Sequence, residues 1–360
     1  MCIRDRIYTI DLSPSADQFP ELFEYGMNHF FAHLDERIRS IIRAGDAKLI
    51  LSCLNEKCDG YEKHNILTNI KIQDPGIGRW TELWTPWSVP KSKVDTIHLK
   101  DVPMYETLMC EEFDEQPLKI KRNKKFISLC RRYQPERIAT FMFLVAHNLI
   151  DQGYVSMPSK SVHAPFVTLY SEAATGHLMD SDVALLDFPF VKKALENDSV
   201  KNNQDHVLDI EPLTEQQRAI YNPENQGFGF NAKQQSLAQY YNDSYLSLIQ
   251  EGDGYDQRHS FMITEKTIRA MMLNHMFVMI GPPRLLMSLH EKGYKTFEDI
   301  WDESYDLIED DKERLVKSLN ICKELIEGDI ESLYKQAEPI IKHNRDRIFQ
   351  RIEEFRETLC

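Results

Sequence analysis

Apolar and polar positions follow two different periods in the first part of the chain. Between residues 19 and 43, apolar side chains recur at helical spacing: Phe23, Met27, Phe30, Phe31, Leu34, Ile38, Ile41 and Ile42. Gly45 ends this pattern, and the run AKLILSCLNE predicts a buried strand directly after it. A helix followed by a buried strand indicates α/β layering. Residues 59–117 are rich in turn-forming residues and predict an irregular segment.

The second part of the chain contains three short apolar runs, each followed by a helical pattern. These runs are Lys124–Cys130, Tyr245–Gln250 and Phe277–Ile280. Apolar strands that alternate with helices predict parallel strands of one sheet, with their carboxyl ends facing a crevice. Residues 156–241 predict a strand, one or two helices near residues 181–196 and a long loop.

The domain division follows from composition. The charge switches sharply around Pro117, so we expect an N-terminal α/β domain at residues 7–118 and a second domain at residues 119–310. Residues 311–360 are expected to be helical. They carry one apolar stripe at Leu315, Leu319, Cys322 and Ile326, and another at Leu333, Ala337, Ile340, Ile341, Ile348, Ile352 and Phe355. The basic run Lys119, Lys121, Arg122, Lys124 and Lys125 is expected to be a solvated linker.

The segment Thr264-Glu265-Lys266 predicts the start of a helix, with Thr264 as N-cap. A helix amino terminus offers unpaired N–H groups and the positive end of the helix dipole, so it suits an anion. A lysine in the first turn is disfavoured by that dipole, and an anionic ligand would explain its presence. An ordinary surface lysine on a capped helix is the alternative.

Four segments together resemble the donor-binding half of the α1,3-fucosyltransferase family. They are LSLIQE ending at Glu251, ITEK ending at Lys266, FVMIGPP from Phe277, and KKFISLCRRYQPERIATFMFLVAHNLID from Lys124. The match covers about a quarter of the chain, which is also similar to glycosyltransferase-like proteins in viral and marine metagenomic sequence. The resemblance implies the two-domain GT-B architecture: an α/β protein with two Rossmann-like domains, here with a helical C-terminal tail.

The resemblance also implies roles for individual residues. Arg137 matches the family's pyrophosphate arginine and Lys266 its phosphate lysine. Glu265 and Glu251 match carboxylates near the ribose and sugar hydroxyls, although the loop after Glu251 is longer than usual. Arg131 and Arg132 are expected at the same edge of the crevice, and Thr264 caps the helix that carries the lysine.

A metal could replace these cations, because either can stabilise negative charge on a departing phosphate. The candidate Asp180-Ser181-Asp182 precedes its apolar run instead of following it, which favours helix capping over a metal role. His29 and His33 are four residues apart, and no third ligand is evident. We therefore expect no metal and no other cofactor. Glu24, Asp46 and Glu56 could each be the general base, and nothing ranks them, so the catalytic residues stay unassigned.

The composition of the chain restricts the classes of partner that we expect it to bind. The net charge of −14 over 360 residues argues against a general nucleic-acid binder. The chain contains no apolar run of 18 residues, so we expect no membrane span. Its seven scattered cysteines favour reduced thiols in a cytoplasm. The first six residues, MCIRDR, resemble a translated sequencing-adapter scar, and we exclude them from the fold prediction.

The sequence thus predicts a metal-independent glycosyltransferase that moves a sugar from a nucleotide-sugar donor to a carbohydrate or glycoconjugate acceptor. A GDP-sugar is the favoured donor. Two alternatives remain open: a non-catalytic carbohydrate- or nucleotide-binding protein with the same fold, and a metal-dependent transferase that uses Asp180 and Asp182.

Overall fold

The structure is a computed structural model, and the part of the chain it describes forms two units. The first unit comprises Met1–Met104 with Asp256–Met262, and the second comprises Tyr105–Tyr255 with Ile263–Cys360. The described residues within them are 6–11, 36–44, 47–52, 81–85, 87–88, 98–101, 103–113, 118, 121–130, 135–157, 187–201, 234–251 and 261–357.

The first unit is built on a parallel sheet of four strands. Its strands are β1 (Arg6–Asp11), β2 (Ala47–Ser52), β3 (Thr81–Thr85) and β5 (His98–Asp101), in the order β1-β2-β3-β5. Helix α4 (Glu36–Arg43) contacts β2, and the short strands β4 (Trp87–Ser88) and β9 (Phe261–Met262) pair antiparallel. The expected strand after Gly45 is confirmed as β2.

Two expectations for this region need comment. The helix predicted over residues 19–43 is described only from Glu36 onward, and its earlier part lies outside the described residues. The prediction that residues 59–117 are irregular was wrong for residues 81–112, which include three strands and a helix. Turn-rich stretches such as WTPWSVP mask strands that are only two to five residues long.

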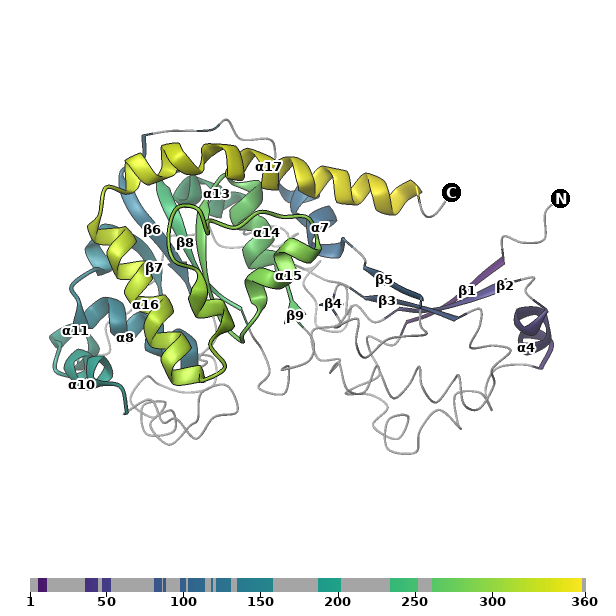
Figure 1. Cartoon of the computed structure of the whole chain (residues 1–360), viewed down its shortest axis with the longest axis horizontal. Helices are drawn as coiled ribbons and strands as arrows, with labels where there is room; N and C mark the ends of the chain where they lie inside the picture. The colour runs from purple at the N-terminus through teal and green to yellow at the C-terminus, as the bar shows by residue number, and fades with distance from the viewer. Residues whose placement is uncertain are drawn as a thin grey trace, which may run out of the picture. The chain divides into compact units, whose positions relative to one another are not determined.

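The second unit contains a parallel sheet whose strand order reverses (Figure 1). Its strands are β6 (Lys124–Leu129), β7 (Gly153–Ser156), β8 (Ser244–Gln250) and β10 (Met276–Ile280), in the order β10-β8-β6-β7. All three pairings are parallel. The predicted parallel arrangement of the three apolar runs is confirmed, and the chain is α/β in class.

Helices lie before, between and after the strands of this sheet along the chain. They are α7 (Met104–Glu112), α8 (Pro135–Ala146), α10 (Pro189–Leu195), α11 (Asp198–Lys201), α13 (Gln234–Asn242), α14 (Glu265–Met272), α15 (Leu285–Glu291), α16 (Asp311–Glu327) and α17 (Ile330–Glu357), with short 3-10 turns η3 (Ile150–Gln152) and η5 (Ser304–Leu307). Helices α13, α14 and α17 contact β8, and α16 contacts β10 and α8. None of the described helices is long and apolar enough to cross a membrane.

Strands β8 and β10 are shielded from water by the helices packed against them. Every residue of β8 and of β10 is buried. Phe126 on β6 pairs in register with Leu246 on β8, and Leu246 pairs with Met276 on β10. These side chains form the middle of the core.

A buried arginine, Arg122, holds together the amino-terminal ends of strands in this sheet. Its guanidinium donates hydrogen bonds to the main-chain oxygens of Tyr241 (2.8 Å), Ser244 and Asn274 (3.1 Å), and to the hydroxyl of Tyr334. It also lies 4.5 Å from the centre of the Tyr334 ring, at a cation–π distance. The solvated linker predicted for this basic run was therefore wrong at Arg122, which joins the starts of β8 and β10 to α17.

Helix α17 fastens further parts of the second unit. The Glu106 carboxylate on α7 accepts hydrogen bonds from Arg351 Nε on α17 (2.9 Å) and from the Tyr294 hydroxyl (3.0 Å). The Asn344 amide bonds both main-chain groups of Lys295, each at 2.8 Å. The structure divides the chain after Met104, whereas the sequence predicted a boundary near Pro117. The structure therefore assigns α7 to the second unit, and the prediction assigned it to the first.

The apolar stripes of the last two helices are largely buried. All four predicted residues of α16 are buried, as are Ala337, Ile341, Ile348 and Ile352 on α17. Leu333, Ile340 and Phe355 are only half-buried. The stripes therefore face the core, as expected from their spacing.

We predict that Arg122→Ala lowers the free energy of unfolding by about 3–5 kcal/mol, because it removes the four buried, charge-assisted hydrogen bonds of the guanidinium and leaves a cavity. The neighbouring exposed Lys121→Ala is the matched control and should change it by less than about 0.5 kcal/mol. Urea titration followed by circular dichroism measures both. Equal effects of the two variants would contradict the role given to Arg122.

Glu303 should make stability depend on pH near neutrality. Burial raises its pKa from 4.5 to about 7, and hydrogen bonds from Thr296 and from the Phe297 N–H oppose this increase. Between these two pH values the folded protein holds a proton that the unfolded chain has released, so unfolding becomes easier as pH rises. Glu303→Gln should thus raise the free energy of unfolding by on the order of 2 kcal/mol at pH 8 and leave it unchanged near pH 4. Urea titrations at both pH values test this, and an equal effect at both would contradict it.

Candidate functional site

The start of α14 is built as its sequence predicts. Thr264 is the N-cap, with extended backbone angles (φ −100°, ψ −178°), and its side chain accepts a hydrogen bond from the Lys266 N–H at 3.3 Å. Glu265 and Lys266 occupy the first turn of the helix. A threonine at this position satisfies one N–H group that the helix itself leaves unpaired.

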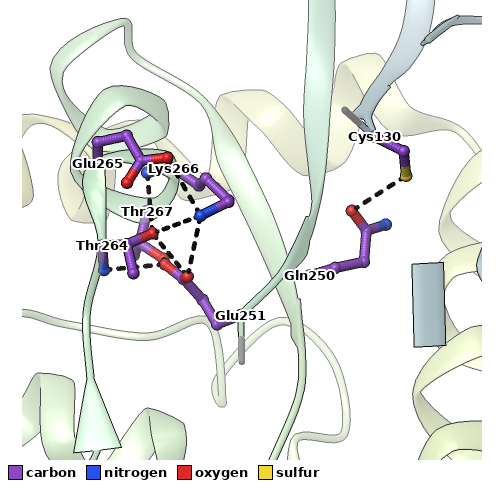
Figure 2. A network of polar contacts seen from close by, with 7 residues as sticks. All are labelled: Cys130, Gln250, Glu251, Thr264, Glu265, Lys266 and Thr267. Carbon is purple, nitrogen blue, oxygen red and sulfur yellow. Dashed lines mark hydrogen bonds and ion pairs between the residues drawn. The ribbon is translucent and has the colours of Figure 1, made fainter. Parts of the chain in front are cut away.

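A completely buried carboxylate, that of Glu251, joins the end of β8 to this helix start (Figure 2). Its Oε1 accepts hydrogen bonds from the Thr264 N–H (3.0 Å) and the Thr267 hydroxyl (2.7 Å). Its Oε2 accepts one from the Thr264 hydroxyl (2.6 Å). Three donors thus satisfy the charge of a group that would be costly to bury alone.

Lys266 lies on top of this network and is partly exposed. Its ammonium is 3.0 Å from Thr264 Oγ1, 3.1 Å from Glu265 Oε1 and 3.8 Å from Glu251 Oε2. Two carboxylates therefore face the lysine that the helix dipole disfavours. This internal charge balance explains how the lysine is tolerated at the helix start.

Glu265 is held as a carboxylate by its neighbours. Burial alone would raise its pKa, but the charges of Lys266 and Arg269 outweigh burial and lower the pKa below its ordinary value. Its Oε2 is buried and has no hydrogen-bond partner among the described residues. The side chain thus uses one oxygen for Lys266 and holds the other, unpaired, inside the protein.

The point where the strand order reverses lies between β6 and β8. The chain runs from β6 through α8 to β7 on one side, and from β8 through α14 to β10 on the other. In open α/β sheets, ligands bind outside the carboxyl ends of the strands at such a reversal. The amino termini of α8 and α14 follow these two carboxyl ends.

Arg137 belongs to the first turn of α8, after β6. It is buried, and its charge acts on Cys130 at the end of β6. Burial raises the pKa of the Cys130 thiol to about 12, while the charge of Arg137 acts in the opposite direction. The Cys130 thiol in turn lies 3.8 Å from Gln250 Oε1, and Gln250 directly precedes Glu251 (Figure 2). Gln250 points toward Cys130 and Glu251 points the other way, toward Thr264, so the end of β8 carries a polar side chain on each face of the sheet (Figure 2).

Several predicted residues lie outside the part of the chain that the structure describes. These are Arg131 and Arg132 at the crevice edge, Asp180 and Asp182, His29 and His33, and the possible bases Glu24, Asp46 and Glu56. Within the described ranges, no three His, Cys, Asp or Glu residues are grouped as a metal site. The cysteines described there, Cys110, Cys130 and Cys322, form no disulfide with one another.

Sequence reasoning missed three members of the site: Thr267, Gln250 and Gly281. Thr267 follows the N-cap by three residues, which is a detectable spacing for a side chain on the same face of the first turn. Gly281 had a signal in the Gly-Pro-Pro turn. An added Cβ there would lie 2.3 Å from the Glu251 main-chain oxygen and 2.6 Å from Leu285 Cδ1, so only glycine fits.

Comparison of the chain with protein-family models, with curated proteins and with solved structures finds no match. The geometry of the site is therefore the basis on which a function can be argued.

We predict that Gly281→Ala displaces the Glu251 main chain and lowers the free energy of unfolding by about 1–3 kcal/mol. Gly328→Ala is the control, because its Cβ would meet the Glu324 and Leu325 main-chain oxygens no closer than 3.0 and 3.8 Å, and φ is −78°. Its cost should be smaller. Urea titration measures both, and a larger effect at Gly328 would contradict the close packing inferred at Gly281.

Proposed function

We propose that this chain is a metal-independent glycosyltransferase of the GT-B type, with two Rossmann-like domains and a nucleotide-sugar donor. The observation that supports this most is the pair of helix starts, α8 and α14, that follow adjacent parallel strands at the reversal of strand order. One carries Arg137 and the other Lys266. The resemblance to α1,3-fucosyltransferases assigns these two positions to the donor diphosphate.

The proposed chemistry requires fixed positive charge at this edge. Transfer breaks the bond between the anomeric carbon and the diphosphate oxygen, so negative charge develops on the leaving diphosphate. Preorganised cations and helix N–H groups stabilise such charge without a metal. Arg137, Lys266 and the first turns of α8 and α14 would supply them. The incoming acceptor hydroxyl, on a carbohydrate or glycoconjugate, would lose its proton to a base that the site does not yet identify.

The charge balance around Lys266 favours a ligand with hydroxyl groups as well as phosphates. Lys266 already faces Glu265 and Glu251, so a bare anion would have to compete with two carboxylates. A ribose or sugar hydroxyl could donate to the Glu265 carboxylate, whose side chain is partly exposed beside Lys266. A nucleoside diphosphate sugar offers both kinds of group, and GDP-sugars are the favoured donors.

Calorimetric titration with GDP, UDP and their sugars tests the proposal directly, together with an assay for release of the nucleotide. Binding with release in the presence of an acceptor supports a transferase. Binding without transfer or hydrolysis would favour the non-catalytic binding protein, and dependence on manganese would favour the enzyme that uses Asp180 and Asp182. No binding of any nucleotide would contradict both transferases and leave only a carbohydrate-binding protein.

We predict that Lys266→Ala weakens nucleotide binding by about ten- to a hundredfold, because it removes a charge-assisted phosphate contact. The free energy of unfolding should fall by only about 1 kcal/mol, since Arg269 still faces Glu265. Lys266→Arg should restore binding in part. Lys335→Ala, which removes an exposed lysine paired with Glu331, is the matched control and should bind as the wild type. Wild-type affinity in Lys266→Ala would contradict the assignment.

A further inference from the structure

We propose that Glu251 is a positioning residue, which orients Lys266 through the Thr264 hydroxyl and does not itself touch the ligand. The inference rests on the proposed function, because it names how that site holds its lysine. It differs from the role that the family resemblance implies, in which a carboxylate at this position lies near sugar hydroxyls.

Hydrogen bonds within the protein occupy both oxygens of the Glu251 carboxylate. Its residue is 0% exposed, and both carboxylate oxygens accept hydrogen bonds from residues of α14 and its cap. Its main chain is fixed as well, since the Glu251 N–H donates to the Ile280 oxygen at 3.0 Å and Gly281 packs against the Glu251 oxygen. A side chain held in this way cannot turn to meet a ligand without breaking the helix cap.

The Thr264 hydroxyl transmits the position of this carboxylate to the lysine. A hydroxyl has one proton to donate and two lone pairs to accept with. The Thr264 proton goes to Glu251 Oε2, at 2.6 Å. Its oxygen then accepts from both the Lys266 N–H (3.3 Å) and the Lys266 ammonium (3.0 Å). The carboxylate therefore fixes the direction in which the hydroxyl presents its lone pairs.

A neutral amide at position 251 would remove this control. If the glutamine oxygen keeps the two bonds of Oε1, its NH2 group points at Thr264 Oγ1 as a donor. The hydroxyl must then accept from the amide, and the bonds to Lys266 compete with it. The negative charge 3.8 Å from the ammonium is lost at the same time. Near the positive end of the α14 dipole, the lysine then keeps only the Glu265 carboxylate, at 3.1 Å, and is held less firmly at the helix start.

The first test needs no ligand. Acetylation of individual lysines by acetic anhydride at pH 8, followed by mass spectrometry, should show Lys266 reacting about threefold faster in Glu251→Gln, because losing a nearby carboxylate favours the neutral amine. Lys335 in the same molecule is the internal reference and should keep its rate. Thr264→Val should accelerate Lys266 similarly, whereas Thr264→Ser, which keeps the hydroxyl, should match the wild type. The two threonine variants also decide the question if Glu251→Gln does not fold.

The second test is a double-mutant cycle on GDP affinity, measured by calorimetry. Glu251→Gln alone should weaken binding about tenfold. In the Lys266→Ala background the same change should alter affinity less than twofold, because a residue that acts only through Lys266 has nothing left to position. A tenfold loss that persists in that background would show direct ligand contact and overturn the inference.

The two tests separate the inference from the proposed function. Unchanged Lys266 acetylation in both Glu251→Gln and Thr264→Val would overturn the positioning role even if the wild type binds GDP. If the wild type binds no nucleotide but the acetylation rates change as expected, the proposed function fails while Glu251 still orients Lys266.

Discussion

The buried guanidinium of Arg122 is the interaction on which the second unit most depends. It bonds main-chain oxygens just before β8 and β10 and a side chain on α17, so one residue sets where two strands begin and where the last helix crosses them. Two of these oxygens have a second donor, because the Tyr334 hydroxyl donates to the Asn274 oxygen and His275 Nε2 bonds the Tyr241 oxygen. The guanidinium joins these groups into one buried network at the amino-terminal ends of the strands.

The opposite end of β8 carries the complementary arrangement. Where Arg122 brings donors to carbonyl oxygens, Glu251 brings acceptors to the N–H and hydroxyl groups of Thr264 and Thr267. One strand thus runs between a buried cation and a buried anion, each fully engaged with the protein. A sheet fixed at one edge can present polar groups at the other without distortion, which is the arrangement that binding sites on open α/β sheets use.

Sequence analysis predicted the parts of this architecture that depend on local pattern. The three strands of the second unit, the cap at Thr264 and the stripe of α16 each follow from spacing or residue type. It misjudged Arg122 as solvated, because the burial of that side chain depends on partners 119 to 212 residues away. For the same reason the sequence could not show that the Glu251 oxygens are taken up by Thr264 and Thr267, and Gly281 gains its importance only from the strand end packed against it.

The contacts of α17 have a consequence for the order of events at the ribosome. Arg122 bonds Tyr334 and Glu106 bonds Arg351, and these partners lie 212 and 245 residues further along the chain. Neither contact can form until the later residue has been synthesised. At about 5–20 residues per second, the nascent second unit spends on the order of ten seconds or more with a buried charge still lacking its final partners. During that interval the incomplete unit exposes apolar surface that α17 later covers, which makes it more prone to aggregate than the finished fold.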